Sequence, residues 1–134
     1  MTNHLAHALG IGDPARAGRP FATLPDGRRI LHGELDAASA AMAQGLRGLG
    51  VQPGDRVAVQ VEKSIEALML YLATIRAGAL FLPMNTAYTP AEVGYFLGDA
   101  GPRLFVCDPA RADALAPVAA GAGARLETMG ADGA

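Results

Sequence analysis

The sequence predicts an α/β fold, in which a mainly parallel sheet with flanking helices follows an N-terminal β-hairpin. Strand-like apolar segments alternate with helical apolar patterns from Arg56 to Met129, and such β-α repeats build parallel sheets covered by helices. Turn signals rich in glycine and proline separate these segments. Helix-capping residues, clearest in Thr89-Pro90-Ala91-Glu92, stand where helices are expected to begin.

A hairpin and a helix come first. Two short strand-like segments, Phe21–Leu24 and Arg29–Leu31, flank the turn signal Pro25-Asp26-Gly27, a pattern typical of a β-hairpin. A helix is expected next, because apolar or small residues recur every three or four positions, at Leu35, Ala38, Met42, Gly45 or Leu46, and Leu49. Gly48 and Gly50 end that pattern.

The first β-α unit begins after the turn Pro53-Gly54-Asp55. Segment Arg56–Val61 has valine at every second position and is predicted to be a strand. Ser64 is expected to cap the second helix, and Gly78 to supply its left-handed C-terminal residue. The predicted buried face of this helix consists of Ile65, Leu68, Met69, Leu72 and Ile75.

Two further β-α units complete the pattern. Strand Leu80–Met84 leads to the capping box at Thr89, and the helix after it is expected to bury Val93, Phe96 and Leu97. Strand Arg103–Cys107 leads to a helix capped by Asp108, followed by a last strand at Arg125–Met129. The predicted organisation is a lead-in over 1–19, an α/β unit over 20–129, and a linker or truncation point at 130–134.

Composition excludes several classes of partner. The formal net charge is −2, and ten of the eleven basic residues are scattered arginines, so no basic footprint for nucleic acid or for a membrane surface is present. Arg76 interrupts the apolar stretch Ala67–Met84, which predicts a buried helix and strand rather than a membrane span. Because the N-terminus lacks a signal-peptide pattern, the expected compartment is the cytoplasm.

The candidate site residues follow the ends of predicted strands, where ligands gather in parallel sheets. They are Lys63, Ser64, Asn85 and Thr86, proposed as cofactor-binding candidates. Lys63 suits an anion, although a solvated loop with a weak surface ion pair is the more common explanation for such a lysine. Asn85 and Thr86 also suit a purely structural turn. No catalytic residue and no metal ligand is predicted, because the histidines lack partners and Cys107 lies in an apolar strand.

Four segments resemble one enzyme family, the adenylate-forming (AMP-binding) acyl-CoA synthetases. Leu31–Leu35 is similar to the first core segment of that family, and Val51–Ala58 to a turn of the form Gly-Asp-Arg-Val. Glu62–Tyr88 is similar to the second core segment, and Gly101–Asp108 to a later strand. Within the superfamily, the segments Glu62–Ser64, Leu70–Thr74 and Leu82–Thr89 most resemble those of the malonyl-CoA synthetases. Leu31 departs from the pattern, because serine or threonine usually caps the first helix there.

The resemblance implies the N-terminal subdomain of an ATP-dependent acid–CoA ligase. The parent enzyme would use ATP, Mg²⁺ and coenzyme A, and would act on a small, malonate-like carboxylic acid. The family's Thr-Ser-Gly-Thr-Thr-Gly loop and its C-terminal lysine are not in these 134 residues. We therefore expect the chain alone to be inactive and to bind none of these cofactors tightly.

The resemblance leaves two alternatives open. The chain is part of the ligase, or it is a non-catalytic α/β interaction module derived from one. The module would associate with the remainder of the ligase or with itself. A third alternative is a binding role, without catalysis, for a coenzyme A or nucleotide fragment.

Overall fold

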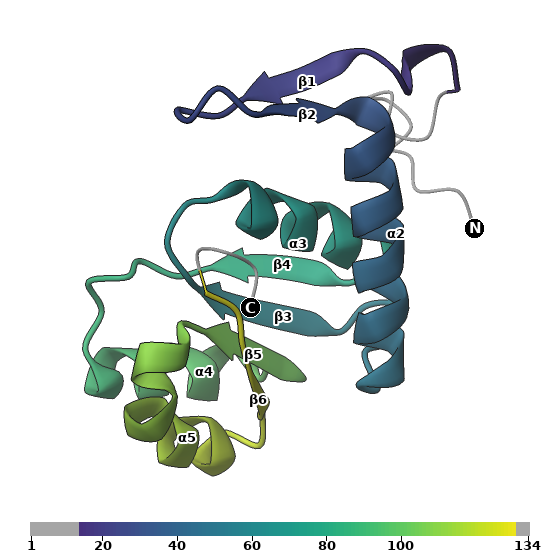
Figure 1. Ribbon diagram of the computed structural model, residues 1–134. Coiled ribbons are helices and arrows are strands. Elements are labelled where there is room, and N and C mark those ends of the chain that lie inside the picture. Colours follow the sequence, from purple (N-terminus) through teal and green to yellow (C-terminus); the bar gives the residue numbers. More distant parts are fainter. Residues whose placement is uncertain (1–13, 131–134) are drawn as a thin grey trace.

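The computed structural model describes residues 14–130 and shows helices packed on a central sheet, with a small hairpin above it (Figure 1). The elements, in chain order, are η1 (Pro14–Arg16), β1 (Pro20–Thr23), β2 (Arg29–Leu31), α2 (His32–Gly48), β3 (Arg56–Gln60), α3 (Ile65–Arg76), β4 (Leu80–Pro83), α4 (Pro90–Ala100), β5 (Leu104–Cys107), η2 (Pro109–Arg111), α5 (Ala112–Gly121) and β6 (Arg125–Thr128). This order confirms the predicted hairpin followed by β-α repeats.

The main sheet is fully parallel and has the strand order β4-β3-β5-β6. The chain passes from β3 outward to β4, then crosses over β3 to add β5 and β6 on the other side. The chain reverses its direction of winding between β3 and β5, and such points form crevices at the carboxyl ends of the strands. β1 and β2 pair antiparallel in a separate sheet.

Two apolar clusters form on opposite faces of the sheet. Alternate strand residues divide between them, because successive side chains of a strand point to opposite faces. Val57 and Val59 join a cluster with residues of α2 and α3, whereas Ala58 and Phe105 join a cluster with residues of α4 and α5. All four residues of β5 are buried, as expected for an inner strand covered on both faces.

The predicted helix ends are largely confirmed. Ser64 Oγ accepts a hydrogen bond from the Ala67 amide, and Thr89 with Glu92 forms the complete capping box. Gly78 has a φ of 78°, the left-handed conformation that the end of α3 requires. Leu31 occupies the N-cap of α2 and makes no side-chain hydrogen bond to it.

Three details differ from the predictions. α3 buries Leu70, Leu72, Ala73 and Thr74, whereas only Leu72 of these belongs to the predicted face. The helix is covered on two sides, by the sheet and by α2, so one stripe does not describe its burial. Phe96 is 40% exposed rather than buried. Asp108 caps the short helix η2 instead of starting α5 directly.

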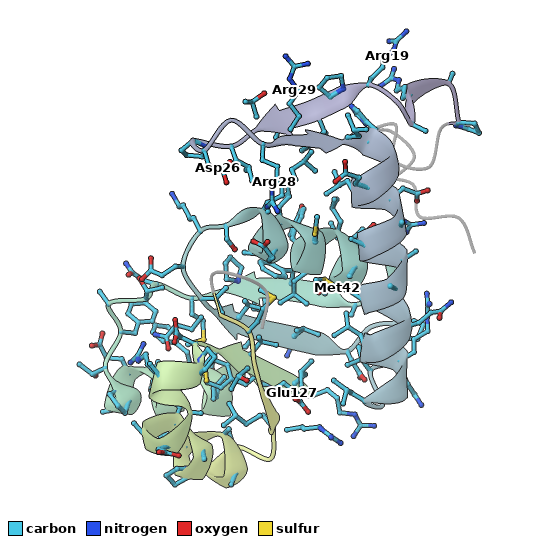
Figure 2. All side chains as sticks on the ribbon, in the orientation of Figure 1. Arg19, Asp26, Arg28, Arg29, Met42 and Glu127 are labelled. Carbon is cyan, nitrogen blue, oxygen red and sulfur yellow. The ribbon has the colours of Figure 1, made fainter. Side chains whose placement is uncertain are left out.

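The hairpin lies apart from the main sheet and packs beside α2 and α3 (Figure 1). Its turn residues Asp26 and Arg28 lie above α3, with the Arg28 side chain directed toward that helix (Figure 2). Arg28 Nη2 lies 4.0 Å from Glu66 Oε1. Most of the predicted linker (131–134) and most of the lead-in (1–13) lie outside the described residues, and the proposed division of the chain stays a prediction.

Candidate functional site

A groove of about 510 Å³ opens at the carboxyl ends of β3 and β4, on the face that α3 covers. Its apolar walls include Val59, Val61, Ala67, Leu68, Tyr71, Phe81, Pro83 and Met84. Its polar rim consists of Glu62, Lys63, Ser64, Asn85 and Thr86. The structure therefore brings together all four candidate residues named from the sequence, although they come from two loops.

Two of the four candidates already hold their loops in place. Ser64 Oγ accepts from the Ala67 amide at 3.0 Å, which fixes the first turn of α3. Asn85 Oδ1 accepts from the Ala87 amide at 2.9 Å, a local turn that asparagine favours. Both side-chain oxygens therefore have structural roles, as the alternative interpretation of the sequence allowed for Asn85.

The other two candidates are free for a ligand. None of the ion pairs among the described residues involves Lys63, and no hydrogen bond in that part of the chain involves the Thr86 hydroxyl. Lys63 is the single lysine of the chain and is exposed at the rim. The surface ion pair proposed for it with a neighbouring acid does not form. The groove thus offers an unpaired ammonium group above apolar walls.

Two residues that sequence reasoning missed hold the loop that follows β4. Gln60, only 1% exposed, donates through Nε2 to the Asn85 carbonyl at 2.9 Å and to the Tyr88 carbonyl at 3.4 Å. Arg111, from η2, donates to the carbonyls of Thr86 at 3.2 Å and of Tyr88 at 2.9 Å. This loop is therefore clamped from β3 and from η2. The sequence signal for this clamp is Gln60, a polar residue that stands between the valines of the predicted strand Arg56–Val61.

Cys107 is fully buried in the cluster with α4 and α5. Burial raises the pKa of its thiol; the nearby charge of Arg111 lowers it, and that of Asp108 raises it. A buried thiol with a raised pKa is a poor nucleophile, in line with the interpretation of Cys107 as a small apolar residue. The absence of a catalytic residue in the chain stays a prediction.

The described residues show neither a metal-binding cluster nor a membrane-spanning helix. Within residues 14–130, no three histidine, cysteine or acidic side chains lie close enough together to hold a metal ion. No helix in this range has the length and apolar character needed to cross a membrane.

The side-chain oxygen of Gln60, Oε1, is buried and has no hydrogen-bond partner.

A groove at the carboxyl edge of a parallel sheet lies where open α/β proteins commonly bind ligands. The chain belongs to the family of AMP-binding enzymes, whose family model matches residues 14–131. This finding confirms the resemblance identified from the four sequence segments.

Individual relatives are also similar to this chain. The feruloyl-CoA synthase of an Amycolatopsis species is 36% identical over 117 residues, which cover 84% of this chain and 24% of that protein. The structure of apo MatB from Rhodopseudomonas palustris, a malonyl-CoA synthetase, is 45% identical with a TM-score of 0.90. That match covers 98% of this chain and 26% of MatB. ATP-bound MatB matches with a TM-score of 0.85. The chain thus spans about a quarter of the length of these relatives.

Proposed function

We propose that the chain is the N-terminal part of an ATP-dependent, AMP-forming acid–CoA ligase. The observation that carries this proposal is the likeness to MatB over 98% of the chain, at 45% identity. We propose a small, malonate-like carboxylic acid as the substrate, because MatB resembles this chain throughout the segments that the structure describes. The proposed compartment is the cytoplasm.

In the proposed reaction, a carboxylate oxygen attacks the α-phosphorus of ATP and pyrophosphate leaves. The thiol sulfur of coenzyme A then attacks the acyl carbon, and AMP leaves. Such transfers depend on cations that neutralise charge on phosphate. The described residues contribute one unpaired lysine and no acidic cluster suited to Mg²⁺, so they do not fit the phosphoryl-transfer site.

Within the whole ligase, the contribution that we propose for this chain is to help bind and orient a ligand at the groove. Lys63 would attract an anionic group, and the Thr86 hydroxyl would donate or accept one hydrogen bond beside it. The walls, formed by Tyr71 and Phe81 among others, would contact an apolar portion. The Tyr71 and Phe81 rings meet edge to face with centroids 5.1 Å apart, which fixes the shape of this wall.

The test of inactivity uses the purified 134-residue chain. We expect no malonate-dependent exchange of labelled pyrophosphate into ATP, whereas MatB assayed in parallel gives exchange. Detectable exchange by the chain would show that our proposal of an inactive part is wrong. Thermal melting with and without coenzyme A or ATP is expected to show no ligand-induced shift at micromolar concentrations.

The genetic context provides the second test. Sequencing the source DNA past the codon for Ala134 is expected to reveal an open frame with a Thr-Ser-Gly-Thr-Thr-Gly loop. A stop codon at that position would contradict the proposal of a ligase part and favour the interaction module instead.

A further inference from the structure

Helix α4 carries apolar residues on two different faces. Val93 and Leu97 are buried in the cluster beneath the helix. Tyr95 and Phe96 point elsewhere, and they are 72% and 40% exposed. A helix that only covers a sheet needs one apolar stripe. The second face of α4 is therefore left largely uncovered by the described residues.

The exposed residues of α4 form a continuous surface with the loop before the helix. Tyr88 and Phe96 stack with ring centroids 5.0 Å apart and an interplanar angle of 18°. Tyr95 meets Phe96 edge to face at 5.5 Å. We call Tyr88, Tyr95 and Phe96 the aromatic patch. The other large exposed apolar side chains of the described residues, Phe21 and Leu80, lie on separate strands.

The aromatic patch is held in a fixed position. The Tyr88 carbonyl accepts from both Gln60 and Arg111, and the capping box at Thr89 fixes the first turn of α4. On its other side α4 lies against α5, where a Cβ at Gly94 would come within 3.4 Å of Val118. A rigid aromatic surface loses little conformational entropy when another surface covers it.

We infer that the aromatic patch is the face of this chain against which the remaining polypeptide of the ligase packs. This inference rests on the proposed function. About three quarters of MatB lies beyond the part that this chain matches, so a large partner surface is expected in the same polypeptide. A contiguous exposed apolar patch of about a few hundred Å² on a monomer often marks a functional surface or an interface. The covering surface should be apolar over the three rings and should place no acidic group opposite Glu92 and Asp99, since the charged residues of α4 are both acidic.

A second copy of this chain fits the aromatic patch less well. A stable interface between two chains buries about 800 Å² on each partner. Three aromatic side chains supply about 150–250 Å² each when fully buried, and here Tyr88 and Phe96 are already partly covered. The patch alone is thus too small for a stable dimer, whereas it suits one part of a larger interface within a single polypeptide.

The test compares Tyr95 in two settings, the 134-residue chain and a MatB chimera in which this chain replaces the matching quarter. A tyrosine-selective nitrating reagent is applied to both, and peptide mass spectrometry reports the modification of each tyrosine. We expect Tyr95 to react about tenfold or more slowly in the chimera, because a covered ring reacts only through local opening. Tyr71, which lines the groove, provides an internal comparison, and ligase activity of the chimera is measured in parallel.

The outcomes separate the inference from the proposed function. An active chimera with a slowly reacting Tyr95 supports both. An active chimera in which Tyr95 reacts as fast as in the chain overturns the inference alone. An inactive chimera contradicts the proposed function alone, because the nitration rate of Tyr95 still reports whether the ring is covered. Protection of Tyr95 in the chain that disappears on dilution would make a second copy the occupant and overturn the inference.

A pair of variants gives an independent readout. Tyr95→Ser is expected to leave the melting temperature of the chain nearly unchanged, because the ring is mostly exposed, but to lower the melting temperature and soluble yield of the chimera. Phe21→Ser, an exposed aromatic outside the patch, serves as the matched control. Equal effects of Tyr95→Ser in both settings, or the same difference for Phe21→Ser, would count against the aromatic patch.

Discussion

The four polar candidates at the groove fall into two groups, those whose side chains already accept a hydrogen bond within the protein and those whose side chains do not. Ser64 and Asn85 accept hydrogen bonds from amides of their own loops, so replacing them changes local structure whether or not a ligand binds. Lys63 and Thr86 have side-chain atoms without such roles in the described chain. An effect of Lys63 on ligand binding would therefore be interpretable, whereas an effect of Ser64 would mix binding with folding.

We expect Ser64→Ala to lower the free energy of unfolding by about 1 kcal/mol, the usual cost of losing a helix N-cap. Lys63→Gln should change it by less than about 0.5 kcal/mol, because exposed, unpaired side chains contribute little. Urea unfolding followed by circular dichroism measures both. A larger loss for Lys63→Gln than for Ser64→Ala would mean that Lys63 has a structural partner.

Cys107 offers a second test, since it is the single cysteine and is fully buried. Burial raises the pKa of its thiol above the ordinary value. Folding therefore favours the neutral thiol, so this contribution to stability is complete below the ordinary thiol pKa and is lost as the pH rises above it. Native protein should react with iodoacetamide roughly a hundredfold more slowly than protein in urea. Equal rates would show that the strand β5 is open in solution.

At the scale of elements, local sequence patterns predict where a helix begins and ends better than they predict which of its faces is buried. The capping box at Thr89 and the glycine at Gly78 were predictable because each acts within one turn of its own helix. The exposure of Phe96 was not, because a helical period cannot say which of two apolar faces meets the sheet. The clamp by Gln60 and Arg111 joins residues more than twenty positions apart, so no local sequence pattern predicts it.

The clamp predicts a measurable loss when Gln60 is replaced. Gln60→Leu leaves the carbonyls of Asn85 and Tyr88 without this donor, and we expect a loss of about 1–3 kcal/mol in the free energy of unfolding. Hydrogen exchange should also accelerate at the amides of Ala87 and Tyr88, which lie in the clamped loop. Gln52→Leu, at an exposed glutamine, is the matched control and should stay within about 0.5 kcal/mol. A variant at Gln60 as stable as this control would show that the clamp is dispensable.

For the whole molecule, the sequence predicted the α/β class and the succession of elements, but not the strand order β4-β3-β5-β6. Strand order depends on which edge of β3 each following strand joins. That depends on packing between residues far apart in the sequence, which form the two apolar clusters. The groove was predictable only as a set of strand ends. Its apolar walls come from α3 and β4 together, and their meeting is a consequence of that packing.

The hairpin is expected to be the least stable part of the described structure. Of its strand residues only Ile30 is buried, and a two-stranded hairpin has little stability of its own. Its turn contacts α3 through Arg28 and Glu66, an ion pair at 4.0 Å with an exposed arginine, which contributes little. The inner strands β3 and β5, by contrast, are covered on both faces of the sheet. Native-state hydrogen exchange should therefore show the amides of Leu24 and Gly27, which bond within the turn, exchanging about tenfold or more faster than those of Val59 and Val106. Similar protection at all four amides would mean that the hairpin unfolds only with the sheet, and that its packing on α2 and α3 is much stronger than its burial indicates.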